Sequence, residues 1–159
     1  MTWRVRRVVT GHDANGKAVV LKDEISGNVT SRRPGQQGCV IWTTNVSPAD
    51  NTDETDRSAA QTGTTSPNGT VFRIVRYEPG VTPRMHRSDS IEYAVVLEGA
   101  ITMQLDNGVE VTLNAGDTLV QRGTIHNWTN KGSVPCVVAF VLIDAKPVEI
   151  GGKRLDAVN

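Results

Sequence analysis

The regular return of short, β-branched segments separated by turn residues is the feature that most constrains how this chain can fold. Beyond residue 69 these segments are rich in Val, Ile and Thr, and Gly, Asn, Asp or Pro occupies the gaps between them. Strands spaced roughly 8–12 residues apart in this way are typical of a β-sandwich or β-barrel. We therefore expect an all-β fold, with strands at 70–78, 90–99, 100–106, 109–114, 118–123, 126–130 and 135–144.

The first 69 residues have a different character. Residues 47–69 are small and polar, which predicts a long surface loop. The polar tail at 149–159 is expected to run over the surface. With a length of 159 residues, the whole chain (1–159) is predicted to be one domain. Within 1–46 we expect N-terminal strands at 4–10, 18–24 and 39–45.

Charge and hydropathy argue against several classes of partner. Lys and Arg together number 17, as do Asp and Glu, so no basic surface for nucleic acid or an anionic membrane is expected. The longest apolar run, 136–143, is too short to span a bilayer. The N-terminus lacks the apolar core of a signal peptide, so a cytoplasmic protein is expected. Cys39 and Cys136 lie in strand-like runs and are expected to be buried thiols.

Two of the three histidines, His86 and His126, stand beside predicted strands far apart in the sequence. Glu92 follows the first of them and shares a strand face with Ala94 and Val96. The opposite face of that strand is also apolar, so we expect both faces to be covered. A carboxylate buried there needs a partner.

His86, Glu92 and His126 offer two neutral nitrogens and one carboxylate. This ligand set suits Fe(II), Mn(II), Ni(II) or Zn(II), with coordination positions left open for water or substrate. The alternative is a pocket in which the three side chains hydrogen-bond to one another and hold no ion. Trp128 shares a face with His126 if that segment is extended, which makes the indole a candidate substrate wall.

The segment "GVTPRMHRSDSIEYAVVLEG" resembles the first motif of the cupin superfamily. Gly80, His86, Glu92 and Gly99 fall on the motif positions with the right intervals. Ser88 occupies the place of the second motif histidine.

The segment "GDTLVQRGTIHNWTN" resembles the second cupin motif. Gly116 opens the motif, His126 takes the ligand position and Asn130 closes it. Arg122 stands where the motif usually has proline, and the spacing to the histidine is one residue shorter than the common form. The N-terminal residues 6–19 extend the resemblance to a narrower group of small bacterial and fungal cupins.

The resemblance implies a jelly-roll barrel of two antiparallel sheets, with cupin motifs within 70–144. It also implies a single metal held by His86, Glu92 and His126, with Ser88 in the fourth ligand place. In many small cupins the N-terminal strands pack on a second subunit, so a homodimer is expected.

The first hypothesis for function is a metal-dependent lyase acting on a small organic acid or phenolic metabolite through an enolate. Glu92 or His126 would move the proton, and Trp128, Ser88 and Arg122 would contact the substrate. A non-haem iron dioxygenase is an alternative, because two histidines and one carboxylate are its usual ligands. A non-enzymatic small-molecule-binding module is a further alternative.

Overall fold

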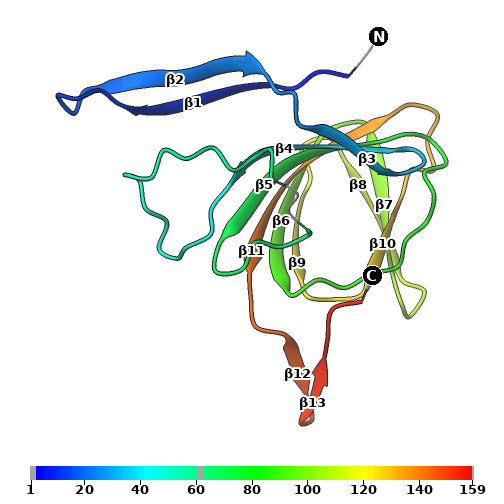
Figure 1. The fold of residues 1–159 in the computed structure, drawn as a ribbon. Helices are drawn as coiled ribbons and strands as arrows, with labels where there is room; N and C mark the ends of the chain where they lie inside the picture. The colour runs from blue at the N-terminus through cyan, green and yellow to red at the C-terminus, as the bar shows by residue number, and fades with distance from the viewer. Residues whose placement is uncertain (1–2, 61–62, 159) are drawn as a thin grey trace.

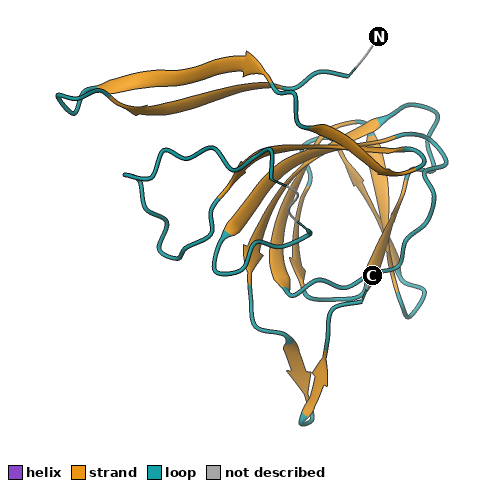
Figure 2. Cartoon of the chain, in the orientation of Figure 1, coloured by secondary structure: helices purple, strands orange, loops and turns teal. Residues whose placement is uncertain are grey.

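The computed structural model describes residues 3–60 and 63–158 of the chain. These residues form β-strands, turns and loops, and no helix occurs among them (Figure 2). The strands are β1 Arg6–His12, β2 Ala18–Ile25, β3 Val29–Arg33, β4 Gln36–Thr43, β5 Thr70–Tyr77, β6 Ser90–Glu98, β7 Ala100–Leu105, β8 Glu110–Asn114, β9 Thr118–Arg122, β10 His126–Thr129, β11 Cys136–Asp144, β12 Val148–Ile150 and β13 Lys153–Leu155.

Two antiparallel sheets curve around a common interior (Figure 1). The larger sheet has six strands in the order β3-β4-β5-β11-β6-β9, and the smaller has three in the order β10-β7-β8. Sequence-distant strands are neighbours in the larger sheet, as in a jelly roll, where the chain crosses between two packed sheets. The expected all-β jelly-roll barrel is thus confirmed.

The core lies between the two sheets, and every second side chain of a strand points into it. Val138 of β11 stands opposite Val75 of β5 on one side and Val96 of β6 on the other. All three side chains are buried. Branched side chains fit this pleated surface closely, which stabilises the sheet through packing.

The motif positions require glycine because of the local backbone conformation. Gly99, at the sharp turn between β6 and β7, has a φ of 71°. A Cβ at this position would lie 2.6 Å from the carbonyl oxygen of Pro135. Any other residue would therefore suffer both backbone strain and a clash. Gly80 and Gly116, the other two motif glycines, also have positive φ values, 70° and 92°.

Two hairpins lie outside the barrel. The β1–β2 hairpin extends away from it at the N-terminal end, and β12–β13 hangs below it (Figure 1). The prediction that the tail merely runs over the surface was wrong, because residues 148–155 form this second hairpin. Gly151 and Gly152, with φ of 58° and 75°, supply the conformations that a two-residue hairpin turn requires.

The expectation that β6 is covered on both faces was also wrong. Glu92, Ala94 and Val96 are buried, but Tyr93 is 47% exposed and Leu97 is 48% exposed. The outer face of this part of the sheet is open to solvent, since Val95 of β6 and Val120 of the neighbouring β9 are exposed as well. The alternation of side chains between the two faces was predicted correctly. Apolar side chains on a strand face do not, however, show that another layer packs on that face.

Two smaller expectations can also be compared with the structure. Cys39 and Cys136 are free and buried, as predicted. Across residues 3–60 and 63–158, no helix has the length and apolar character needed to cross a membrane.

Candidate functional site

The backbone brings the two motif histidines face to face. His86 and His126 form an isolated antiparallel bridge and exchange both backbone hydrogen bonds, each at 2.9 Å. Their ring centroids are consequently only 4.3 Å apart. The predicted convergence of these two residues, separated by forty positions in the sequence, is confirmed.

Both imidazoles are held in the same tautomer. The Nδ1 atom of His86 lies 3.1 Å from the carbonyl oxygen of Arg84, and Nδ1 of His126 lies 3.0 Å from that of Thr124. Because a carbonyl oxygen can only accept, each Nδ1 carries the proton and each Nε2 of the neutral ring keeps a lone pair.

Burial keeps both rings neutral. It lowers the pKa of His86 to about 4, and repulsion from His126 adds to the effect. Burial also lowers the pKa of His126. At physiological pH the site therefore holds two neutral imidazoles.

Glu92 lies in the same interior but is held by serines. Its Oε1 atom accepts hydrogen bonds from Ser88 Oγ at 2.6 Å and from Ser90 Oγ at 3.1 Å. Ser88, in the place of the second motif histidine, thus holds the carboxylate through a short, charge-assisted bond. All three side chains are buried.

The donor set fits a divalent metal only in part. His126 Nε2 is buried with no hydrogen-bond partner, and such a nitrogen is a good ligand for a first-row divalent ion. Glu92, however, is turned to the serines. Among the described residues no group of three or more His, Cys, Asp or Glu side chains is arranged to hold an ion. The two imidazoles fit a metal, whereas the third expected ligand is not in position.

A small cavity of about 30 Å³ opens beside these groups. That volume accommodates one or two water-sized groups. His126 lies behind His86 and against Trp128, with ring centroids 5.8 Å apart, and does not itself line the cavity. The lining residues are Arg32, Arg33, Gln36, Thr64, Arg73, Tyr77, Arg84, His86, Glu92, Trp128 and Phe140.

The structure places Arg122 away from the interior cavity, in a separate pocket that Ser88 and Ser90 also line. Arg122 is exposed at the end of β9, and its neighbour Gln121 takes the buried position opposite Glu92. Trp128 does line the cavity, with its ring against Phe140 at a centroid distance of 5.7 Å.

Several residues that line the cavity or bind Glu92 were not singled out from the sequence as part of the site. Ser90 was missed although it lies two residues before Glu92, on the same strand face, which was a usable signal. For Arg73, alternation along the strand shows only that it and Arg76 lie on opposite faces, not which of them faces the barrel. Arg33 and Tyr77 carried no local signal.

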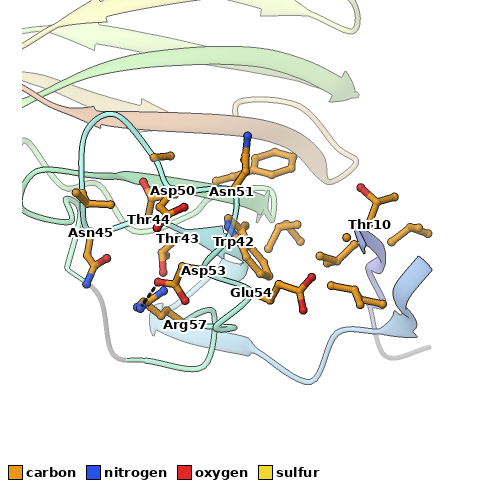
Figure 3. A pocket seen from close by; sticks show the side chains of 18 residues that line it. Thr10, Trp42, Thr43, Thr44, Asn45, Asp50, Asn51, Asp53, Glu54 and Arg57 are labelled. Carbon is orange, nitrogen blue, oxygen red and sulfur yellow. Dashed lines mark hydrogen bonds and ion pairs between the residues drawn. The ribbon is translucent and has the colours of Figure 1, made fainter. Parts of the chain in front are cut away.

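A separate pocket lies outside the barrel, between the β1–β2 hairpin, strand β4 and the loop that follows it (Figure 3). Its volume is about 350 Å³, and Trp42 and Glu54 are among its lining residues. An ion pair between Arg57 and Asp53, 2.7 Å, closes one side. None of the motif residues lines this pocket, so we place the candidate site at the smaller interior cavity.

A jelly-roll barrel with two histidines and a glutamate on its motif strands defines the cupin class of protein. The cupin domain profile (Cupin_2) matches residues 73–143, close to the span expected from the motifs. The chain belongs to the cupin family.

Its curated relatives are fungal proteins. The chain is 35% identical over 162 residues to the "Cupin-domain-containing oxidoreductase fogC" of Aspergillus ruber, covering 96% of this chain and 79% of the relative. It is 39% identical over 163 residues to the "Phomopsin biosynthesis cluster protein C'" of Diaporthe leptostromiformis, covering 96% and 85%.

Solved structures show the same fold at low identity. The polyketide cyclase RemF from Streptomyces resistomycificus superposes with a TM-score of 0.54 at 20% identity, covering 87% of this chain and 84% of that one. An uncharacterised double-stranded β-helix protein from Klebsiella pneumoniae gives 0.52 at 18% identity, covering 74% and 84%. These similarities bear on the fold alone.

Proposed function

We propose that this chain is a metal-dependent cupin enzyme that acts on a small organic acid or phenolic metabolite at the interior cavity, with lyase-type chemistry. The observation that carries the proposal is the pair of neutral imidazoles, His86 and His126, opposed at 4.3 Å beside the buried carboxylate of Glu92. Relatives named after biosynthesis clusters support a role in small-molecule metabolism.

The chain's own groups can hold and move a proton. Glu92 lines the cavity, so its carboxylate can exchange a proton with a bound substrate, and His126 keeps an unprotonated Nε2 close behind it. Decarboxylation, dehydration and isomerisation share an enolate intermediate, and each needs a proton taken or delivered beside it. Ser88 acts through Glu92 by orienting the carboxylate, and Trp128 forms an apolar wall.

A divalent Fe, Mn, Ni or Zn ion bound by the two histidines would act as a Lewis acid on a substrate oxygen. Glu92 would complete the ligand set by turning its carboxylate toward the histidines, whereas Ser88 and Ser90 hold its Oε1 atom.

Elemental analysis of the purified protein tests the metal part of the proposal, with His126→Ala as the variant and His12→Ala as the matched control. His12 ends the N-terminal strand β1 and is exposed. We expect about one ion per chain in the wild type and in His12→Ala, and loss of the ion in His126→Ala. A metal-free wild type of normal stability would favour a non-enzymatic small-molecule-binding cupin instead.

A second candidate is dioxygen chemistry of the non-haem iron type. The names of several relatives as cupin-domain-containing oxidoreductases favour it. The identity of the ion retained after anaerobic purification separates the two candidates. Iron, together with oxygen uptake on addition of a substrate acid, supports the oxidative reaction; zinc, manganese or nickel without oxygen uptake supports the lyase.

We further propose that the chain forms a homodimer through the β1–β2 hairpin. The hairpin projects from the barrel and exposes Val8, Val20 and Ile25 (Figure 1). Sedimentation velocity of Val20→Lys, with Val134→Lys as an equally exposed control outside the hairpin, tests this. We expect only Val20→Lys to be monomeric; a wild-type monomer would refute the proposal.

A further inference from the structure

Four arginines converge on the interior cavity. Arg32 and Arg33 come from β3, Arg73 from β5, and Arg84 from the loop before β6. The one carboxylate among the described residues that line this cavity is Glu92. Two of these arginines, Arg33 and Arg73, bear on ligand binding because of their buried donor atoms.

Two of these guanidinium groups have buried donors without partners. Nε and Nη1 of Arg33 and Nε of Arg73 are buried and make no hydrogen bond in the described structure. The hydrogen bonds that the structure shows for Glu92 come from Ser88 and Ser90, not from these donors. Unpaired buried donors cost free energy unless a ligand or water accepts from them.

The fold directs Arg73, and not Arg76, into this space. Arg73 stands opposite Phe140 in register, and its Cζ lies 5.8 Å from the centre of that buried ring. Arg76, three residues along the same strand, has Nε 2.8 Å from Glu78 Oε1. The inward arginine thus lacks the carboxylate that its outward neighbour has.

The arginines also lie close enough to influence one another. Burial lowers the pKa of Arg33, and the charge of Arg84 lowers it further. Arg33 and Arg73 line the same cavity as Tyr77, and the charge of each opposes the rise that burial causes in the pKa of that phenol. An arginine stays protonated in proteins, so the charge persists and calls for an anion.

We propose that Arg33 and Arg73 bind the carboxylate of the substrate, so that the cavity selects a small organic acid over a neutral phenol. This inference rests on the proposed function and narrows its substrate class. The planar guanidinium fork matches a carboxylate in bidentate geometry. A singly charged carboxylate is also less repelled by Glu92 than a doubly charged phosphate is. The rings of Trp128 and Phe140 offer an apolar wall for the rest of the acid.

Equilibrium binding tests the inference without requiring turnover or a metal. The arginine Nε–H signals of the isotope-labelled protein are followed by NMR during titration with formate and with acetate. The neutral isosteres formamide and acetamide serve as ligand controls, and inorganic phosphate is the competing oxyanion. We expect at least one carboxylate to shift the Arg33 and Arg73 signals in a saturable way, and its amide to leave them unchanged.

Arg73→Gln and Arg76→Gln are the matched variants, since they remove the same charge from opposite faces of β5. We expect Arg73→Gln to weaken carboxylate binding about ten- to a hundred-fold, the loss typical of a charge-assisted hydrogen bond. Arg76→Gln should bind as the wild type does. A thermal melt of each variant verifies that it is folded, and Arg33→Gln provides a second, independent removal of the site.

Four outcomes would overturn the inference. These are binding of the amides as tight as that of the acids, equal weakening in both β5 variants, phosphate binding in preference to both carboxylates, and no shift with either acid. Because binding is measured apart from catalysis, failure of the carboxylate site leaves the metal analysis of His126→Ala as a separate test of the proposed function.

Discussion

Arginines with buried donor atoms have opposite surroundings in two regions of this molecule. Arg7 on β1 is only 6% exposed, yet its guanidinium group donates to Glu24, Asp56, Ser58 and the carbonyl oxygen of Ile41. Arg33 and Arg73 in the barrel bury donors that have no partner.

This difference distinguishes Arg7, which stabilises the fold, from Arg33 and Arg73, whose unpaired donors are available to a ligand. Arg7 connects the N-terminal hairpin to the loop after β4 and to β4 itself, and its hydrogen bonds offset the cost of burying the charge. The buried donors of Arg33 and Arg73 also lose their contact with water, but no hydrogen bonds offset the cost in free energy. A fold retains such groups where a partner from outside completes them, as functional sites often do.

The largest expected effect on stability comes from Arg7→Gln. Removing the guanidinium leaves Asp56 partly buried without its main partner, so we expect the free energy of unfolding to fall by about 2–4 kcal/mol. Urea denaturation measures it. Arg6→Gln is the matched control, because the adjacent Arg6 is exposed and pairs with Asp23 alone. Equal midpoints for the two variants would contradict a structural role for the Arg7 cluster.

The hydrogen bonds around Arg7 should also make the difference in unfolding free energy between the wild type and Arg7→Gln depend on pH. Burial raises the pKa of Asp56, but hydrogen bonds from Arg7 and Ser58 outweigh it and hold that pKa well below its ordinary value. A carboxyl with a depressed folded-state pKa stabilises the fold above its unfolded pKa of about 4 and loses this contribution as the pH falls. The gap between wild type and Arg7→Gln should therefore shrink below about pH 4. Denaturation at neutral and acid pH checks this, and a gap that widens in acid would refute it.

A smaller effect is expected for the serines that hold Glu92. Ser88→Ala removes the shorter hydrogen bond to the carboxylate and leaves Glu92 freer to join the histidines. We expect metal affinity to rise, by about tenfold at most. Ser90→Ala, which removes the 3.1 Å bond, should have less effect. Competition with a chelator measures both. A loss of affinity in Ser88→Ala would mean that the serine orients Glu92 toward the ion.

The smallest effect on stability is expected for Arg73, whose buried Nε has no hydrogen-bond partner. Arg73→Gln breaks no hydrogen bond of its buried Nε, so without ligand its free energy of unfolding should stay within about 0.5 kcal/mol of the wild type or exceed it. The urea midpoint checks this. A loss as large as that of Arg7→Gln would show that Arg73 is a structural residue, and the contrast between the two regions would disappear.

The strands of the barrel other than β3, the turns between them and the motif histidines could be predicted from the sequence alone. These depend on local physics, namely β-branched side chains, period-2 alternation and glycine at positive φ, as at Gly99. The pairing of His86 with His126 could be predicted because the motif resemblance carries long-range information. The hairpin at 148–155 could have been predicted from the adjacent glycines at its turn.

Only the tertiary structure decided which face of each strand is enclosed and which side chains from distant strands meet. Alternation shows that Arg73 and Arg76 point to opposite sides, but not which one enters the barrel. The exposure of Tyr93, the hydrogen bonds of two serines to Glu92 and the presence of Arg33 and Arg73 at one cavity also depend on how separate segments pack. Burial and charge pairing are properties of the assembled sheets, whereas local propensity and alternation extend only a few residues along the chain.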